Sequence, residues 1–280
     1  MTGIIREPRR PEGFVPVGPV PPGIASGVLP DDDEDVCRLS GEWGVFQKLR
    51  GHRWSLDDLL VAHVAAQEAV EPRRCLDLGC GIGSVLLMTA WRFQSARCEG
   101  VDAQQVSLTL ARKSLAWNGV GDRVAVRAQD LRSPGAFEEG AFELVTGSPP
   151  YFPLGEGTLS PRSQAPECRF EHRGGVEAYC EAAARALSPG GVFAIVASVK
   201  QAERLRAATA GLDVARWVDV IPREGKAPLI FVAVLRREAP SMRRETLTVR
   251  ERGGQWTPEF VRVRASMGMP TRAPGSWRES

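Results

Sequence analysis

The sequence predicts an α/β protein in which a mostly parallel sheet carries helices on both faces. Short apolar runs typical of buried strands alternate with amphipathic helical segments along most of the chain. One of these runs, 75–78, passes into a turn with glycine at every second position, and a helix is expected directly after it. With 280 residues and 43% hydrophobic content, the chain can bury a full core without disulfides.

The glycine turn is the most informative stretch. Gly79, Gly81 and Gly83 lack a Cβ, so the backbone can turn sharply and approach a ligand closely. The helix expected over 84–92 would point free N–H groups at an anionic or polar group in the turn. A dinucleotide site has the motif G-x-G-x-x-G, whose third glycine would fall at the position of Ser84 in this chain. Asp77, which would repel a pyrophosphate, suits a cationic amino acid group, so a dinucleotide oxidoreductase is disfavoured.

The pattern D-x-G-x-G-x-G after a first strand resembles motif I of the class I S-adenosylmethionine (SAM) methyltransferases. The resemblance implies a Rossmann-like, seven-stranded, mostly parallel sheet. It also implies SAM as the cofactor, with Asp77 and the three glycines among its contacts. A glycine turn in another α/β protein is the alternative, and the rest of the chain has to decide between them.

Two more acids follow expected strands. The strand 97–101 ends at Asp102, at the spacing where nucleotide-binding α/β sites place the acid that holds ribose hydroxyls, although a helix cap is the alternative. The strand 123–128 is followed by Asp130. In methyltransferases of this type the acid after the third strand meets the adenine amino group, and a carboxylate can accept from that N–H₂. A surface loop aspartate is an equal alternative for Asp130.

A second motif follows the strand 142–146, where the chain reads Gly-Ser-Pro-Pro-Tyr-Phe over 147–152. Pro149 and Pro150 stiffen the backbone and leave carbonyl groups as acceptors. The motif resembles the signature of enzymes that methylate amino groups conjugated to a planar system. Ser148 and the Pro149 carbonyl would accept the two N–H hydrogens of the target amine, which stabilises charge developing in the transition state. Tyr151 would stack on the flipped base.

The polar segment 152–173, rich in Gly and Pro, is expected to be a substrate loop. Arg169 in this loop is a candidate for contact with a substrate phosphate, and a solvated ion pair with Glu171 is the alternative. Phe152 is a further candidate substrate contact beside the motif.

The remaining elements complete the expected sheet. A helix should start at Ser55 and run to about 67, with Asp57 and Asp58 in its first turn; helix start is the favoured role for both, and a ligand contact from Asp57 is the alternative. Further helices are expected over 104–118, 176–187 and 201–210, and a fifth strand over 192–197. The runs 214–221 and 229–235 read as an antiparallel hairpin at one edge, which brings the strand count to seven.

Composition sets the domain limits and excludes some classes. Residues 1–36 are rich in Pro and Gly, end in an acidic run and are expected to be a disordered extension. A methyltransferase domain should cover 37–240, and an Arg-rich extension 241–280, disordered beyond about 269. The net charge of +2 indicates no strong overall field for nucleic acid. Six cysteines without a C-x-x-C pair or a nearby histidine favour a reducing cytoplasm and no metal, and no run is apolar enough to span a membrane.

From about 41 to 265, the chain resembles the bacterial tRNA(Val) anticodon-loop adenine N6-methyltransferase-like proteins. Besides the two motifs, the matching pieces include Gly51-x-Arg53-Trp54-x-x-Asp57, Cys168-Arg169-Phe170-Glu171 and Gly253-Gly254-x-Trp256-Thr257. The resemblance implies methyl transfer from SAM to the exocyclic amino group of a base in RNA, with adenine N6 of tRNA as the expected target. It also makes Arg53 a candidate substrate contact.

One residue departs from this family, which has Asn, or sometimes Asp, where the chain has Ser148. A hydroxyl is a shorter and weaker acceptor than an amide oxygen. Ser-Pro-Pro-Tyr is also the form found in many cytosine N4-methyltransferases of DNA. The alternatives therefore remain cytosine N4, a protein glutamine side chain, or a SAM-binding or RNA-binding protein without catalysis.

Overall fold

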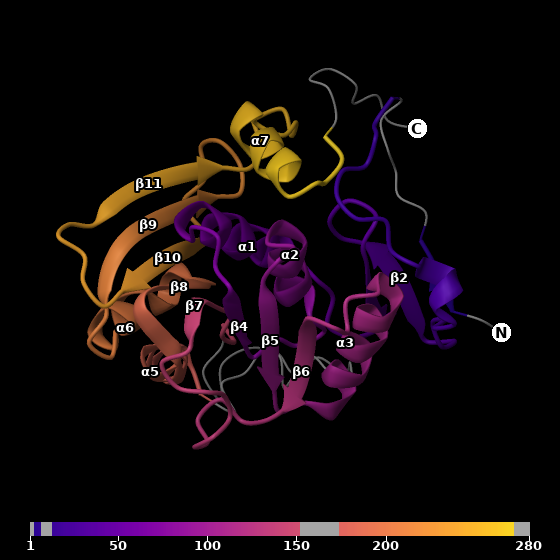
Figure 1. Cartoon of the computed structure of the whole chain (residues 1–280). Helices are drawn as coiled ribbons and strands as arrows, with labels where there is room; N and C mark the ends of the chain where they lie inside the picture. The colour runs from indigo at the N-terminus through magenta and orange to yellow at the C-terminus, as the bar shows by residue number, and fades with distance from the viewer. Residues whose placement is uncertain (1–2, 7–12, 152–173, 272–280) are drawn as a thin grey trace.

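The computed structural model describes residues 3–6, 13–151 and 174–271. Its main sheet has eight strands in the order β11-β9-β10-β8-β7-β4-β5-β6 (Figure 1). In chain order these are β4 (Arg74–Leu78), β5 (Arg97–Asp102), β6 (Val124–Ala128), β7 (Phe142–Gly147), β8 (Leu187–Ser198), β9 (Asp213–Ile221), β10 (Ile230–Arg236) and β11 (Arg243–Thr248). The helices are α1 (Leu56–Glu68), α2 (Ser84–Arg92), α3 (Gln105–Asn118), α5 (Val176–Ala186), α6 (Ala202–Ala207) and α7 (Pro258–Ser266).

The sheet is mostly parallel, which confirms the predicted fold class. Strands β6, β5, β4, β7 and β8 pair in parallel, and β10 runs antiparallel to both β8 and β9. The carboxyl ends of β4, β5 and β7 therefore meet at one edge of the sheet. The residues just beyond these ends are the glycine turn, the Asp102 region and the Ser-Pro-Pro-Tyr motif.

Both faces of the sheet are covered. Along β8, Val192, Ala194 and Val196 pack into a core with α1 and α2, whereas Phe193 and Ile195 pack on the opposite face with α5. Alternate side chains of a strand point to opposite faces, so a strand that is buried on both sides reads as one continuous apolar run. This packing explains why the apolar runs were recognisable as strands.

The predicted count of seven strands is one short. Strand β11 pairs in parallel with β9, so the hairpin of β9 and β10 does not form the edge. Part of the Arg-rich end thus belongs to the folded body: Leu247 and Val249 are buried, and the Thr257 Oγ1 caps α7 by accepting from the Phe260 N–H at 3.1 Å. The strand was not predicted because its few apolar residues are surrounded by arginines, so the composition of the segment is that of an exposed extension.

The segment before residue 49 also differs from the expectation of a disordered extension up to 36. Strands β1 (Ile4–Ile5), β2 (Glu34–Arg38) and β3 (Gly44–Lys48) form a second sheet of three strands. The acidic run lies in ion pairs, since the Lys113 ammonium on α3 contacts both Asp31 and Glu34 at 2.7 Å. The run is therefore neutralised by lysines and arginines that are distant in sequence, and the pairing holds this segment against the core.

Element boundaries differ in small ways. Helix α1 begins as predicted, with the Ser55 N–H donating to the Asp58 Oδ2 at 3.0 Å. Strand β8 covers Leu187–Ser198, so it starts earlier than the predicted strand over 192–197. Helix α6 covers 202–207, shorter than the predicted 201–210, and follows a short 3₁₀ turn at Val199–Gln201.

Candidate active site

The glycine turn after β4 has the backbone that its sequence requires. Gly79, Gly81 and Gly83 have φ angles of +63°, +53° and +84°, in the left-handed region that favours glycine. A Cβ on Gly79 would lie 2.1 Å from the Tyr179 hydroxyl, so a larger residue cannot fit there. Gly83 directly precedes α2, so the loop lies at the N-terminal end of that helix.

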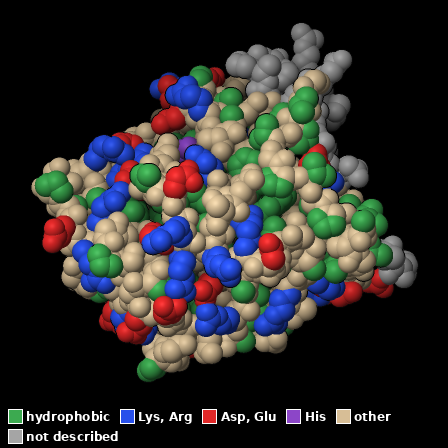
Figure 2. Space-filling model, viewed as in Figure 1, with side chains coloured by type: hydrophobic (Ala, Val, Ile, Leu, Met, Phe, Trp, Pro, Cys, Tyr) green, Lys and Arg blue, Asp and Glu red, His purple; other side chains and the backbone are tan. Residues whose placement is uncertain are grey.

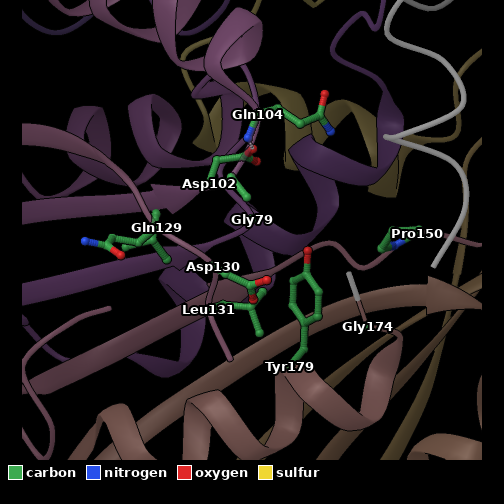
Figure 3. Close-up of a pocket in the computed structure, with 11 residues that line it drawn as sticks. Gly79, Asp102, Gln104, Gln129, Asp130, Leu131, Pro150, Gly174 and Tyr179 are labelled. Atoms are coloured by element: carbon green, nitrogen blue, oxygen red, sulfur yellow. Dashed lines mark hydrogen bonds between the residues drawn. The ribbon is translucent and has the colours of Figure 1, made fainter. Parts of the chain in front are cut away.

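Asp102 holds the loop from the neighbouring strand. Its Oδ2 accepts from the Gly81 N–H at 2.9 Å, and its Oδ1 accepts from the Gln104 N–H at 2.6 Å. Figure 3 shows the second of these bonds. The predicted ligand role of Asp102 is not tested by these contacts, but they fix the carboxylate at the carboxyl end of β5.

Asp77 is buried behind the glycine turn, with 3% of its surface exposed. Its Oδ1 accepts from the Thr146 hydroxyl at 2.8 Å, whereas its Oδ2 has no hydrogen-bond partner in the described part of the chain. Burial raises the pKa of this carboxyl to about 8. A buried carboxylate oxygen without a partner is costly unless a ligand completes it, so the site is suited to a cationic group.

A cavity of about 600 Å³ connects the glycine turn with the Ser-Pro-Pro-Tyr motif. Its wall includes the segment before α1, the glycine turn and the motif; the lining residues used below are Arg53, Asp57, Asp58, Asp77, Gly79, Gly81, Ser84, Asp102, Ser148, Pro149, Pro150 and Tyr151. A smaller hollow of about 60 Å³ adjoins it and is lined by Asp130 and Leu131. The two spaces share lining residues such as Gly79 and Tyr179, and so form one continuous site.

The smaller hollow is shown in Figure 3. Tyr179 rises from its helix between Asp130 and Leu131 on one side and Pro150 on the other. The Asp130 carboxylate accepts from the Arg132 Nε at 2.9 Å and from its Nη2 at 2.6 Å. Asp130 therefore lines the smaller hollow, and its charge is balanced by an arginine that the sequence reading did not consider.

The Ser-Pro-Pro-Tyr motif contributes a buried acceptor to the larger cavity. The Ser148 Oγ is buried and has no hydrogen-bond partner among the described residues. The Pro150 carbonyl accepts from the Gln201 side chain at 2.8 Å, and the Tyr151 hydroxyl donates to the Asp57 Oδ2. These two contacts tie the second half of the motif to other elements, and Ser148 in its first half is among the residues that line the cavity.

The candidate substrate contacts are only partly described. Arg53 lines the cavity, where its Nη2 donates to the Asp35 Oδ2 at 2.9 Å and its Nη1 donates to the Lys48 carbonyl at 3.3 Å. Phe152 and Arg169 lie outside the described residues.

Sequence reasoning did not assign Tyr179 or Arg132 to the site, and it gave Asp57 mainly a helix-start role. The helical periodicity of α5 already accounts for an aromatic residue at position 179, so nothing in the pattern marked Tyr179 as a site residue. The glycine at 79 was the one available signal, because it leaves room for that ring.

The fold and the site define a SAM-dependent methyltransferase. Residues 41–160 match the family model described as "Methyltransferase small domain". The chain is 31% identical over 194 residues to the tRNA1(Val) (adenine(37)-N6)-methyltransferase of Tolumonas auensis, covering 68% of this chain and 79% of that protein. The protein of the same name from Porphyromonas gingivalis is 28% identical, over 75% of this chain and 86% of its own. The chain belongs to this family of methyltransferases.

The solved structures agree on the fold. A predicted O-methyltransferase from Agrobacterium tumefaciens superposes with a TM-score of 0.61 over 78% of this chain and 99% of its own, at 19% identity. This likeness supports the sheet architecture and carries no information on the target of methylation.

No group of three or more His, Cys, Asp or Glu residues in ranges 3–6, 13–151 and 174–271 could hold a metal ion. Within the same ranges no helix is long and apolar enough to cross a membrane.

Proposed function

We propose that this protein methylates the exocyclic N6 of an adenine in tRNA, using SAM bound in the site at the carboxyl ends of β4, β5 and β7. The observation that carries the proposal is the pair of buried, unpartnered oxygens on one cavity wall, the Asp77 Oδ2 and the Ser148 Oγ. One suits the cationic end of the cofactor, and the other suits a hydrogen on the target amine. The names of the two relatives supply the adenine and the tRNA.

The residues at the glycine turn fit SAM. The Asp77 Oδ2 would accept from its ammonium group, and the bare backbone at Gly79 and Gly81 would admit its methionine portion. Asp102 would hold the ribose hydroxyls, and Asp130 would accept from the adenine amino group in the smaller hollow. When bound, SAM supplies an electrophilic methyl group on a positively charged sulfonium. The acidic residues that line the cavity favour the binding of that positive charge.

The target amine would be held by the Ser-Pro-Pro-Tyr motif. An amino group conjugated to a base ring is a poor nucleophile, because its lone pair is delocalised into the ring. The Ser148 Oγ and the Pro149 carbonyl would each accept one N–H hydrogen, which favours a pyramidal nitrogen as the new C–N bond forms. Such acceptors stabilise positive charge that is larger in the transition state than in the ground state. Tyr151 would stack on the extruded base.

RNA is the proposed partner, with contacts from Arg53 and, outside the described residues, Phe152 and Arg169. Figure 2 shows basic and acidic side chains interleaved over the face that Figure 1 presents. This pattern agrees with the net charge of +2 and favours a few local phosphate contacts over one large basic surface. We also propose that the enzyme works in the cytoplasm, where such an RNA substrate is present.

The test is methyl transfer in vitro. Purified protein, SAM with a labelled methyl group and unmodified tRNA should yield labelled N6-methyladenosine on digestion. Ser148→Ala should lower the rate without changing the labelled product. Label in N4-methylcytosine or in protein glutamine, with none in adenosine, would refute adenine as the target.

A further inference from the structure

The first turn of α1 touches both halves of the active site. Asp57 and Asp58 are consecutive residues of this turn, and both line the 600 Å³ cavity. Their carboxylates contact different elements, since Asp57 reaches Tyr151 of the Ser-Pro-Pro-Tyr motif and Asp58 reaches Ser84 at the start of α2. No role in the chemistry above uses either aspartate.

Asp57 binds the hydroxyl of a tyrosine that lies 94 positions further along the chain. Burial raises the pKa of the Asp57 carboxyl, and burial together with this carboxylate raises the pKa of the Tyr151 phenol. The phenol therefore stays protonated and acts as the donor. Fixing the hydroxyl end restrains rotation about the Cα–Cβ bond of Tyr151, so the contact sets the direction in which the ring points from its backbone.

Asp58 contacts the half of the active site that contains the glycine turn. Its Oδ2 accepts from the Ser84 hydroxyl at 3.0 Å and from the Ser55 N–H at 3.0 Å. Only 7% of Asp58 is exposed. Ser84 is the first residue of α2 and follows Gly83 directly, so the contact fixes the end of the glycine turn relative to α1.

We propose that Asp57 and Asp58 are positioning residues with separate roles: Asp57 orients Tyr151 for the target base, and Asp58 orients the glycine turn for the cofactor. This inference rests on the proposed function for the identity of the two ligands. Capping of α1 does not account for the pair, because the contact with the Ser55 N–H is made by Asp58 alone. Asp57 is free for the site, and its contact with Tyr151 is the reason that this carboxylate tolerates burial.

The first arm of the test measures both ligands in variants of the full chain. Asp57→Ala and Tyr151→Phe should each lower kcat/KM for tRNA about tenfold, the loss typical of one hydrogen bond to a charged group, and leave the Kd for S-adenosylhomocysteine within about twofold. Asp57→Asn, which keeps an acceptor oxygen, should recover most of the activity. Combining Asp57→Ala with Tyr151→Phe should cost no more than either alone.

The matched arm concerns Asp58. Ser84→Ala and Asp58→Ala should each weaken S-adenosylhomocysteine binding about tenfold, the double variant should be no worse, and Asp58→Asn should bind nearly as the wild type does. If Asp58→Ala does not fold, Ser84→Ala together with Asp58→Asn still measures the contact. Additive losses within either pair, or equal loss of cofactor affinity in Asp57→Ala and Ser84→Ala, would overturn the division of roles.

A spectroscopic arm separates this inference from the proposed function. The chain has only two tyrosines, so a 3-fluorotyrosine-labelled protein gives two ¹⁹F resonances, and Tyr151→Phe assigns one of them. Asp57→Ala should shift the Tyr151 resonance, and Ser84→Ala should leave it in place. A wild type that binds S-adenosylhomocysteine but methylates no tRNA would refute the proposed function, while the ¹⁹F shifts and the Kd values would still decide the roles of the two aspartates. An unmoved Tyr151 resonance in Asp57→Ala would overturn the role of Asp57.

Discussion

At the scale of single residues, the proposed methyl transfer depends on Ser148. Its hydroxyl is buried beside the cavity without a partner, which costs folding free energy unless a substrate completes the bond. The resemblance described above implies Asn at this position, so the serine either accepts the amine hydrogen itself or marks a changed target. The two cases predict different responses to substitution.

Ser148→Ala removes the acceptor and nothing else of the motif. Turnover should fall by roughly ten- to a thousand-fold, the effect of losing one oriented donor or acceptor in an active site, while the Kd for SAM stays nearly unchanged. Single-turnover rates at saturating SAM measure the first quantity, and calorimetry measures the second. A Ser148→Ala enzyme with the wild-type single-turnover rate would show that the hydroxyl takes no part.

Ser148→Asn restores the acceptor of the related family. On an adenine substrate activity should survive or rise, because the longer amide reaches the same amino group. If the cavity is shaped for a smaller target such as cytosine, the bulkier side chain should block it and activity should fall. A third outcome is a wild type that binds SAM without turnover and a Ser148→Asn variant that methylates adenine. That result would show that catalysis was lost through the serine at position 148.

At the scale of elements, the structure gives the acidic run before β2 a role in building the site. Asp35, at the second position of β2, is fully buried, and its Oδ2 accepts from Arg53 at 2.9 Å and also from Arg6, which follows β1. Arg53 in turn lines the cavity. The three-stranded sheet therefore supports one wall of the active site through the Asp35 carboxylate and the Lys48 carbonyl, which both accept from Arg53.

Asp35→Ala should destabilise the protein and weaken tRNA binding together. The two arginines are partly exposed, so we expect a loss of about 1–3 kcal/mol in the free energy of unfolding, below the value for a fully buried pair. The KM for tRNA should rise because Arg53 loses its anchor. Asp33→Ala is the matched control: Asp33 is an exposed neighbour paired with Lys48, and its removal should cost under about 0.5 kcal/mol. Urea unfolding and steady-state kinetics of both variants give the comparison, and equal effects at 33 and 35 would contradict the assigned role.

Elements with strong local signals could be predicted from the sequence, and those held by distant contacts could not. The parallel strands 75–78 and 142–146 and the glycine turn follow from apolar runs and glycine chemistry. The acids at the strand ends line adjoining spaces, Asp77 and Asp102 the larger cavity and Asp102 and Asp130 the smaller hollow. Strand β2 escaped notice because its acidic residues pair with Arg6, Lys48, Arg53 and Lys113 elsewhere in the chain, and no local pattern reveals such pairs.

The Arg-rich end shows the same limit. Arg243 and Arg244 pair with Glu68 and Asp219, and the Arg264 guanidinium lies 4.1 Å from the centre of the Trp256 ring. Among the described residues that line either part of the site, none comes from β11 or α7. Removing everything after residue 236 would take β11 out of the sheet, so this region is part of the folded domain.

At the scale of the whole molecule, the buried acids make stability depend on pH. The pKa of Asp77 is raised to about 8 and that of Asp58 to about 6, both mainly by burial, whereas in the unfolded chain both carboxyls should titrate near 3.8. Between these values the folded state holds more protons than the unfolded state. Stability from each group is therefore complete below about pH 4 and is lost as the pH rises through its folded pKa.

Asp77→Asn should flatten this dependence. Without ligand, the free energy of unfolding of the wild type relative to the variant should fall by up to about 1.4 kcal/mol per pH unit between pH 4 and 8. Urea unfolding of both proteins at pH 5, 6, 7 and 8 measures the difference between their free energies of unfolding. Other acids, such as Glu177 and Glu245 with lowered pKa values, contribute equally to both proteins, so their contributions cancel in that difference. A difference that does not change with pH would show that Asp77 is ionised in the free protein.

The central claim is that this chain places a methyl group on N6 of an adenine in tRNA through the Ser148 motif. The most direct measurement is nucleoside mass spectrometry of purified tRNA from a strain that lacks the gene, compared with its parent. We predict that N6-methyladenosine falls in one tRNA of the deletion strain, returns when the wild-type chain is supplied, and does not return fully with Ser148→Ala. Unchanged N6-methyladenosine in every tRNA, with the protein present and folded in the parent, would contradict the account.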